Sequence, residues 1–148
     1  MNYNLRDEIA KNIEIVLKEI EQPRPVLVTR EPFDVEKIAI TQFPAVLITP
    51  IREERSSVTM GAPSIGYRQG TIEFLMRGFV RGNDLDSQRS DLILGIESAL
   101  ESDRFRGFIQ QGVTDSQVTL IEIVDRLPPL AEFNLTFFVR YNYARNAQ

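Results

Sequence analysis

The residue types that most often carry enzymatic or metal chemistry are absent from this chain of 148 residues. It contains no His and no Cys, which excludes Ser-His-Asp and Cys-His nucleophiles, zinc sites built from Cys and His, thiol redox chemistry and a disulfide framework. The acid–base groups that remain are carboxylates, tyrosines and three lysines. Because their spacing suggests no catalytic arrangement, we expect no enzymatic activity and no cofactor.

The carboxylates and tyrosines with suggestive spacing are better explained by local structure. Asp84, Asp86 and Asp91 cluster at the predicted start of a helix, where acidic side chains cap the first turn and complement the helix dipole. Tyr141 and Tyr143 share one face of a predicted strand, a pattern typical of core residues whose hydroxyls reach the edge. We therefore predict neither a magnesium cluster nor a tyrosine-based site.

Two glycine-containing segments superficially match nucleic-acid or nucleotide-binding motifs. The segment 77–82 begins like the K/R-G-F motif of RNA-recognition strands, but it lacks the later aromatic residues that stack on bases. Gly61 and Gly66 have the spacing of a phosphate loop, yet Tyr67 and Arg68 stand where Lys and Ser or Thr are required. We expect no sequence-specific nucleic-acid binding and no nucleotide site.

The charge of the chain supports the same conclusion. With 17 basic and 21 acidic residues the formal net charge is −4, whereas a surface that coats nucleic acid carries an excess of Lys and Arg. Of the basic residues, 14 are Arg, which is enriched at protein interfaces because its planar guanidinium makes paired hydrogen bonds and stacks on rings. No apolar run approaches the roughly 20 residues of a membrane-spanning helix. We therefore expect protein partners and no membrane partner.

The elements that position these residues follow from hydrophobic periodicity. Apolar residues recur every three to four positions in two segments and at alternate positions in others, which predicts two amphipathic helices and a set of strands. In chain order we expect a helix over 4–21 capped by Asn4, a short edge strand over 25–29, a buried strand over 43–49, a strand over 71–81, a helix capped by Asp86 and ending near Ser102, and strands over 118–125 and 133–143.

These elements predict one domain, 1–148, of the α+β class. The main order α-β-β-α-β-β is a circular permutation of the ferredoxin-like arrangement, in which two helices cover one face of a mainly antiparallel four-stranded sheet. A polar C-terminal tail is expected over 144–148. The core residues of the sheet are predicted to be Ile72, Phe74, Phe133, Phe137 and Tyr141.

Two regions are predicted to contact other proteins. Residues 51–69 are charged, small or turn-forming and too numerous for a tight loop, which predicts a projecting arm or an extended hairpin tip that reaches a neighbour. The sheet face opposite the helices mixes large apolar residues with Arg, the composition of interface cores. The predicted contact residues are Arg52, Glu53, Glu54, Arg55, Tyr67 and Arg68 in the arm, and Arg77, Phe79, Arg81, Phe138 and Arg140 on the outer face.

The layout of the whole chain resembles that of the tail terminator (tail-completion, minor tail) proteins of tailed bacteriophages. The passage FLMRGFVRGNDLD, which leads from a strand into a helix, is of a type frequent in that family. The other features of the resemblance are the opening helix over 5–21, the strand FPAVLITP over 43–50, the long arm, the strand TIEFLMRGFV over 71–80, the helix over 87–100 and the closing strand over 133–143.

The resemblance implies a structural virion protein with no enzymatic activity. Proteins of this family assemble into a ring, usually a hexamer, on the last layer of the tail tube, stop its polymerisation and join the tail to the neck (connector) proteins; in contractile tails they also contact the sheath. The protein would then be made in the host cytoplasm and reside at the head-proximal end of the tail, where an acidic ring lets DNA pass without binding it. Two alternatives stay open: another neck or tail component of the same layout, or a ferredoxin-like module that binds a small ligand between subunits.

Overall fold

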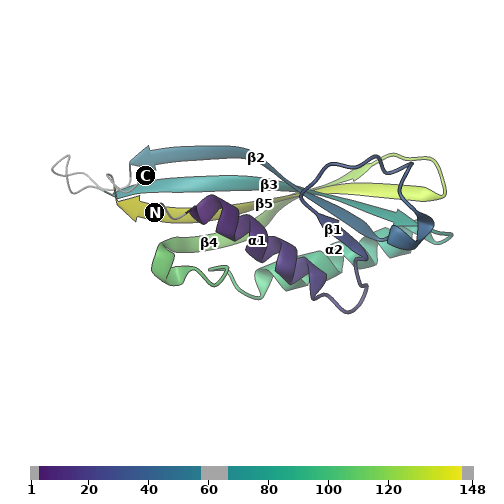
Figure 1. Cartoon of the computed structure of the whole chain (residues 1–148), viewed down its shortest axis with the longest axis horizontal. Helices are drawn as coiled ribbons and strands as arrows, with labels where there is room; N and C mark the ends of the chain where they lie inside the picture. Colours follow the sequence, from purple (N-terminus) through teal and green to yellow (C-terminus); the bar gives the residue numbers. More distant parts are fainter. Residues whose placement is uncertain (1–3, 58–66, 145–148) are drawn as a thin grey trace.

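Two helices and five strands make up the computed structural model, which describes residues 4–57 and 67–144 (Figure 1). The order of the main elements is α-β-β-β-α-β-β, so the predicted α+β class is confirmed. The helices are α1 (Leu5–Lys18) and α2 (Leu85–Glu101). The strands are β1 (Leu27–Thr29), β2 (Ala45–Ser57), β3 (Tyr67–Arg81), β4 (Val113–Val124) and β5 (Leu130–Ala144), with single 3-10 turns at Ile40–Gln42 (η1) and Ile109–Gln111 (η2).

The start of α1 follows from its sequence, whereas the start of α2 is a correction. The Asn4 side chain accepts a hydrogen bond from the Asp7 amide at 3.1 Å, which confirms the predicted N-cap. In α2 the N-cap is Asp84 and not Asp86, which lies in the first turn. Both residues still place a negative charge near the positive end of the helix dipole.

The sheet has five strands in the order β1-β2-β3-β5-β4, one more than the four main strands predicted. The extra strand is the short segment predicted over 25–29: β1 runs parallel to β2 and pairs along Ala45–Leu47, while all other neighbours are antiparallel. A parallel neighbour requires a crossover connection, and here residues 30–44 provide it without an α-helix. The segment is an edge strand, as predicted, but because the usual helical crossover is missing, the sequence pattern did not indicate that its neighbour is β2.

The described part of the predicted arm, residues 51–57 and 67–69, extends the pairing of β2 with β3, in agreement with the extended-hairpin form of the prediction. Residues Ile51–Ser57 belong to β2, and β3 begins at Tyr67, so the two strands remain paired as far as Ser57 opposite Arg68. The sequence therefore contains an extended hairpin whose base is already a sheet of β2, β3 and β5. The predicted tail begins one residue too early, since Ala144 still belongs to β5; residues 58–66 and 145–148 lie outside the described residues.

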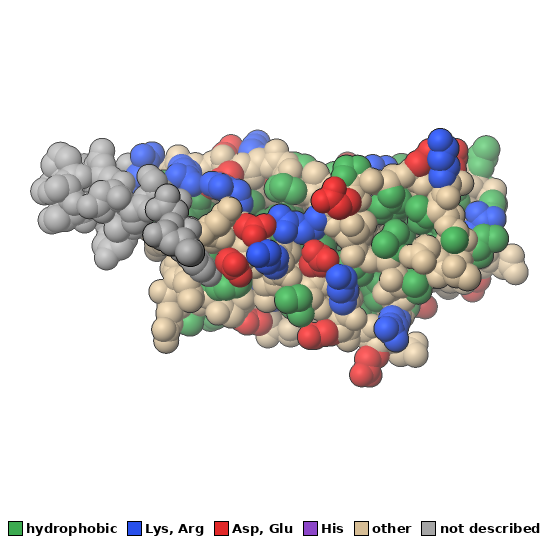
Figure 2. Space-filling model, viewed as in Figure 1, with side chains coloured by type: hydrophobic (Ala, Val, Ile, Leu, Met, Phe, Trp, Pro, Cys, Tyr) green, Lys and Arg blue, Asp and Glu red, His purple; other side chains and the backbone are tan. Residues whose placement is uncertain are grey.

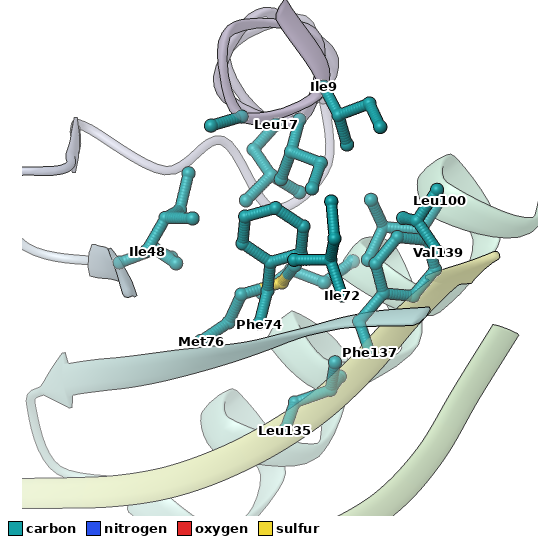
Figure 3. Packing of buried hydrophobic residues seen from close by; sticks show 14 of the residues in the cluster. Ile9, Leu17, Ile48, Ile72, Phe74, Met76, Leu100, Leu135, Phe137 and Val139 are labelled. Carbon is teal, nitrogen blue, oxygen red and sulfur yellow. The ribbon is translucent and has the colours of Figure 1, made fainter. Parts of the chain in front are cut away.

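The main core lies between the helices and one face of the sheet. All five predicted core residues are buried there. In Figure 3, Ile9 and Leu17 of α1 point toward Phe74 and Ile72, and Leu100 of α2 lies near Val139. The amphipathic stripes of the two helices thus bury the face that the strand alternation predicted.

A second, smaller core lies on the opposite face of the sheet. Val35, Ala45 and Phe79 are buried there, and Phe33 from the crossover segment packs against Phe79 edge to face with ring centroids 5.7 Å apart. The prediction that Phe79 is exposed on the outer face is therefore wrong, because residues 30–44 cover it. That segment carries apolar residues at irregular intervals, so periodicity did not reveal its role.

A buried arginine closes the C-terminal end of α2. Arg106 is 1% exposed; its Nε donates to the Asp103 carbonyl at 2.9 Å and its Nη2 donates to the carbonyl of Leu100. The guanidinium also lies over the Phe137 ring, 5.6 Å from the centroid, and burial lowers its pKa. The cation thereby satisfies carbonyls that the helix leaves free and complements the negative end of its dipole.

Candidate assembly interface

The predicted arm residue Glu53 is the centre of an intramolecular network. Its carboxylate accepts a hydrogen bond from Arg6 Nε at 2.5 Å, from Arg55 Nε at 3.0 Å and from the Tyr141 hydroxyl. These partners come from α1, β2 and β5. Arg55 also lies over the ring of Tyr143, 5.0 Å from its centroid. The network therefore fixes the extended part of β2 to the body of the protein.

The ionisation of this network is set by its hydrogen bonds. Burial alone raises the pKa of Glu53, but the hydrogen bonds from Arg6, Tyr141 and Arg55 outweigh it and lower that pKa to about 2. Burial and the hydrogen bond to the Glu53 carboxylate raise the pKa of Tyr141 to about 12. At neutral pH the carboxylate is charged and the phenol is neutral, so each is in the form that the other stabilises.

The remaining predicted arm residues divide between the two faces of the sheet. Arg52 lies on the outer face, where its Nη2 is 3.1 Å from Glu73 and its Nε 3.6 Å from Glu54. Arg68 pairs with Tyr143 and shares the helix-side face with Glu53. The side chain of Tyr67 lies outside the described part of the chain. The structure thus does not bring the predicted arm residues together into one surface.

On the outer face Arg77 belongs to a second ion-pair network, centred on a buried carboxylate. Glu132 is 3% exposed, and its two oxygens are 3.1 Å from Arg77 Nη2 and 2.7 Å from Arg126 Nε. Both guanidiniums also lie over the Phe79 ring, at 5.3 and 5.7 Å from its centroid. Sequence reasoning missed Glu132 and Arg126, because nothing in a strand alternation marks an outward carboxylate as buried.

The other predicted outer-face residues stay accessible. Arg140 lies over the Phe138 ring, 5.0 Å from the centroid, and both side chains are partly exposed. Arg81 is exposed at the end of β3. Contact of Arg81, Phe138 and Arg140 with a partner stays a prediction.

A more conspicuous surface lies along β4, the strand that closes one edge of the sheet. Leu120, Ile121 and Ile123 are 51%, 37% and 54% exposed, and Leu127 in the following turn is 87% exposed. Ile121 and Ile123 are on the helix-side face, opposite Leu135 and Phe133 of β5, whereas Leu120 is on the outer face. These four residues are called the β4 edge patch. Exposed apolar residues gathered along an unpaired edge strand are typical of sites where another chain pairs.

The β4 edge also offers free backbone groups. The first part of β4 is covered by the segment after α2: Ser116 is buried and donates to the Arg104 carbonyl at 2.8 Å. From Gln117 to Ile123 the strand is exposed apart from the half-buried Val118. Both faces of this strand are partly apolar in the sequence. Without the strand order, that pattern is equally typical of a strand buried in the middle of a sheet.

Further exposed apolar residues lie outside the β4 edge patch, in the segments before and after β1. Val26, which precedes β1, is 52% exposed, and Ile40 in η1 is 69% exposed. Figure 2 shows acidic and basic side chains intermingled around α1, and hydrophobic side chains gathered toward the end of the molecule away from the grey residues. Val26 therefore places an exposed apolar side chain next to β1, the other edge strand of the sheet.

The helices border a hollow that could hold a small ligand. It has a volume of about 580 Å³ and lies between the end of α1 and the middle of α2, lined among others by Ile20, Pro23, Leu94 and Gly95. It is shallow, and its charged groups, Glu21 and Asp91, are both acidic and exposed. Ligand pockets usually enclose their ligand among a few convergent polar groups, so this hollow does not favour the small-ligand alternative.

Within residues 4–57 and 67–144, no three His, Cys, Asp or Glu side chains are grouped so that they could hold a metal ion. No helix in the same part of the chain is long and apolar enough to cross a membrane.

No protein-family model and no curated protein sequence matches. A chain from a solved structure described as "Virion of native gene transfer agent (GTA) particle" aligns over 91% of this chain and 92% of its own length, with 6% sequence identity and a TM-score of 0.44.

Proposed function

We propose that this chain is a structural virion protein of a tailed phage or phage-like particle. Copies of it would assemble head to tail into a ring of six that caps the tail tube, stops its polymerisation and presents a joining surface to the neck (connector) proteins. The observation that carries the proposal is the β4 edge patch, because large apolar residues on an unpaired edge strand are exposed only at a cost and attract another chain.

A ring places a specific demand on the subunit. Head-to-tail association requires two different patches on each copy, and a rotation that closes. The sheet is open and its two edges are unlike: β4 is a strand of twelve residues, whereas β1 has three residues and is flanked by Val26. Unlike edges of this kind suit a heterologous contact between neighbouring copies.

The charge of the chain suits a ring through which DNA passes. The chain carries a net charge of −4, and on the outer face the arginines Arg52 and Arg77 are paired with Glu73 and Glu132. Arginines that are already paired are less available to phosphate, so a lumen lined by such a surface would pass DNA without holding it. The same function requires no catalytic residue and no cofactor.

The partners follow from this position in the particle. One rim of the ring would contact the last layer of tail tube subunits and the other rim the neck proteins, with an additional contact to the sheath if the tail contracts. The layout of helices and strands that resembles tail terminators supports a place in the tail. The shortening of tail tubes by the rings, tested below, separates a terminator from other neck or tail components of the same layout.

The central test is the oligomeric state of the full chain, measured by mass photometry and negative-stain electron microscopy. We expect rings of uniform size, and we expect Ile123→Glu to dissociate them, lowering the association constant at least about 100-fold, because a charge would be buried at the contact. The exposed position of Ile123 leaves the stability of the protomer nearly unchanged.

A matched control is available on the helix side. Leu94 is 64% exposed on α2, so Leu94→Glu makes the same change in charge on a surface that the proposal leaves free. Rings should persist in this variant. A wild-type chain that stays monomeric at millimolar concentration would refute the proposal. A further assay, in which the rings shorten tubes formed by the tail tube protein of the same particle, separates a terminator from other ring-forming components.

A further inference from the structure

The pairing register across the sheet shows which residues of the two edge strands, β1 and β4, lie at the same level. Val28 of β1 pairs with Val46, Val46 with Gly78, Gly78 with Phe133, and Phe133 with Ile123 of β4. Val28 and Ile123 therefore lie at the same level of the sheet, one at each edge, and on the same helix-side face. The exposed part of β4 is thus level with β1.

The strand directions are also compatible. β1 is parallel to β2, β2 antiparallel to β3, β3 antiparallel to β5, and β5 antiparallel to β4, so β4 runs antiparallel to β1. A rotation about an axis roughly along the strands keeps these directions. It would therefore bring β4 of one copy beside β1 of the next as an antiparallel neighbour, the pairing that is more stable per residue.

The charges at the two edges are opposite in sign. β1 is flanked by Arg24 and Arg30, and the exposed end of β4 carries Glu122 and Asp125. At equal level, Thr29 faces Glu122 and Val26 faces Asp125, which puts each arginine within one or two residues of an acid. Among the described residues Glu122, Asp125 and Arg24 form no ion pair, whereas Arg30 uses Nη1 for Asp7 at 3.0 Å.

We propose that β1 of a second copy adds to the β4 edge as an antiparallel strand, with Val28 of one copy opposite Ile123 of the other. This proposal rests on the proposed ring and names the contact that builds it. The apolar pair would lie on the helix-side face, the opposite charges would fix the register, and the sheets of successive copies would join into one closed wall of strands. Electrostatic complementarity of this kind mainly sets register and specificity.

The chain has no Cys, which allows a direct test by disulfide cross-linking. We expect the double variant Thr29→Cys with Glu122→Cys, prepared as the full-length ring and oxidised, to form a covalent ladder of multimers. Directly opposite residues of antiparallel strands have Cα atoms about 4.5–5.5 Å apart, within the range of a disulfide. Within one copy the two positions are four strand spacings apart, about 19 Å, so no internal disulfide can form.

The control moves one cysteine along the same strand. Gln117 shares the outer face of β4 with Glu122 but lies five residues away, more than about 10 Å along the strand. Thr29→Cys with Gln117→Cys should give at least about tenfold less ladder. Unfolding curves should be measured for both double variants, and we expect them to coincide, so that a difference in cross-linking cannot come from a difference in folding.

The outcomes separate the contact from the ring. Rings that are visible by microscopy but do not cross-link in the proposed register would overturn the contact and leave the ring function standing. A covalent dimer formed by Glu122→Cys alone would show that β4 pairs with β4 of another copy, which also overturns it. Absence of both rings and ladder would remove the contact together with the proposed function.

Discussion

The sheet has two long stretches of edge, and they differ in how they are protected from association. Beyond β1, the distal part of β2 is an edge that contains Pro50, a register shift between Pro50 and Arg52, and the charged run 52–55. Proline, bulges and charges are the devices by which natural proteins blunt edge strands. The exposed part of β4 has a register shift at Thr119 but no proline and no basic residue, and it exposes the apolar side chains of Leu120, Ile121 and Ile123.

The structure favours a different contact between copies from the one that the sequence predicted. The charged residues 52–55 were predicted to contact a neighbour, yet Glu53 and Arg55 interact with Arg6, Tyr141 and Tyr143 of their own chain. The apolar residues Leu120, Ile121 and Ile123 of β4 were not predicted as contacts, but they remain 37–54% exposed in the protomer. A surface that is already satisfied internally gains little from a partner, whereas an uncovered apolar edge gains most of its burial there.

The largest effect on the protomer is expected from Glu53→Gln, which tests whether the distal part of β2 is held internally. Glu53 has a side chain that is 16% exposed and bonds three partners, so the neutral amide should lower the free energy of unfolding by about 2 kcal/mol. Urea unfolding at pH 7 measures this change. Ring formation should persist at protein concentrations where the variant is folded.

Glu54→Gln is the matched control for that measurement. Glu54 is 68% exposed and has only a 3.6 Å contact with Arg52, so its loss should change the unfolding free energy by less than about 0.5 kcal/mol. Equal effects of the two variants would mean that Glu53 contributes no more than a surface charge, and the contrast between the two edges would then lose its basis.

The network of Glu53 and Tyr141 should make the protein less stable at both acid and alkaline pH. The pKa of Glu53 is depressed to about 2, so its stabilisation is present above its ordinary pKa of 4.5 and is lost as the pH falls from 4.5 to 2. The pKa of Tyr141 is raised from 10.0 to about 12, so the unfolded chain ionises first and stability also falls as the pH rises from 10 to 12. Each of the two losses amounts to at most about 2–3 kcal/mol of unfolding free energy.

Thermal or urea unfolding across these two ranges checks the prediction, with Tyr141→Phe as the comparison. The phenylalanine variant lacks the phenol, so its alkaline loss between pH 10 and 12 should be smaller by about 1–2 kcal/mol. If Tyr141→Phe loses as much stability between pH 10 and 12 as the wild type, the loss is due to other groups. That result would contradict the role of the Tyr141–Glu53 hydrogen bond.

The fold was largely predictable because its main signals are local. The spacing of Ile9, Ile13 and Leu17 gives the helix stripe, and the strict alternation of β5 gives the core face. The network at Glu53 was not predictable, because its partners Arg6 and Tyr141 lie 47 and 88 residues away. Periodicity carries no information on such pairs, which depend on the order of strands.

The candidate interface was predictable only in part for the same reason. Phe79 stands at an outward position of β3, and no pattern in its own strand shows that residues 30–44 cover it. Ile121 and Ile123 occupy helix-side positions that would be core in a central strand, and they are exposed only because β4 ends the sheet. Whether an apolar residue is core or interface thus depends on the strand order, which the sequence pattern leaves open.

The smallest change in stability is expected from Arg52→Ala. This variant is also the most direct check on whether the charged edge of β2 contributes to assembly. Arg52 is 59% exposed and pairs at the surface with Glu73 and Glu54, so its removal should cost less than about 0.5 kcal/mol of unfolding free energy. If β4 rather than the charged run 52–55 makes the contact between copies, the association constant measured by mass photometry should change by less than about twofold. A loss of rings on this substitution, with the protomer still folded, would show that the blunted edge is part of the interface and that exposed charge, not uncovered apolar surface, drives assembly.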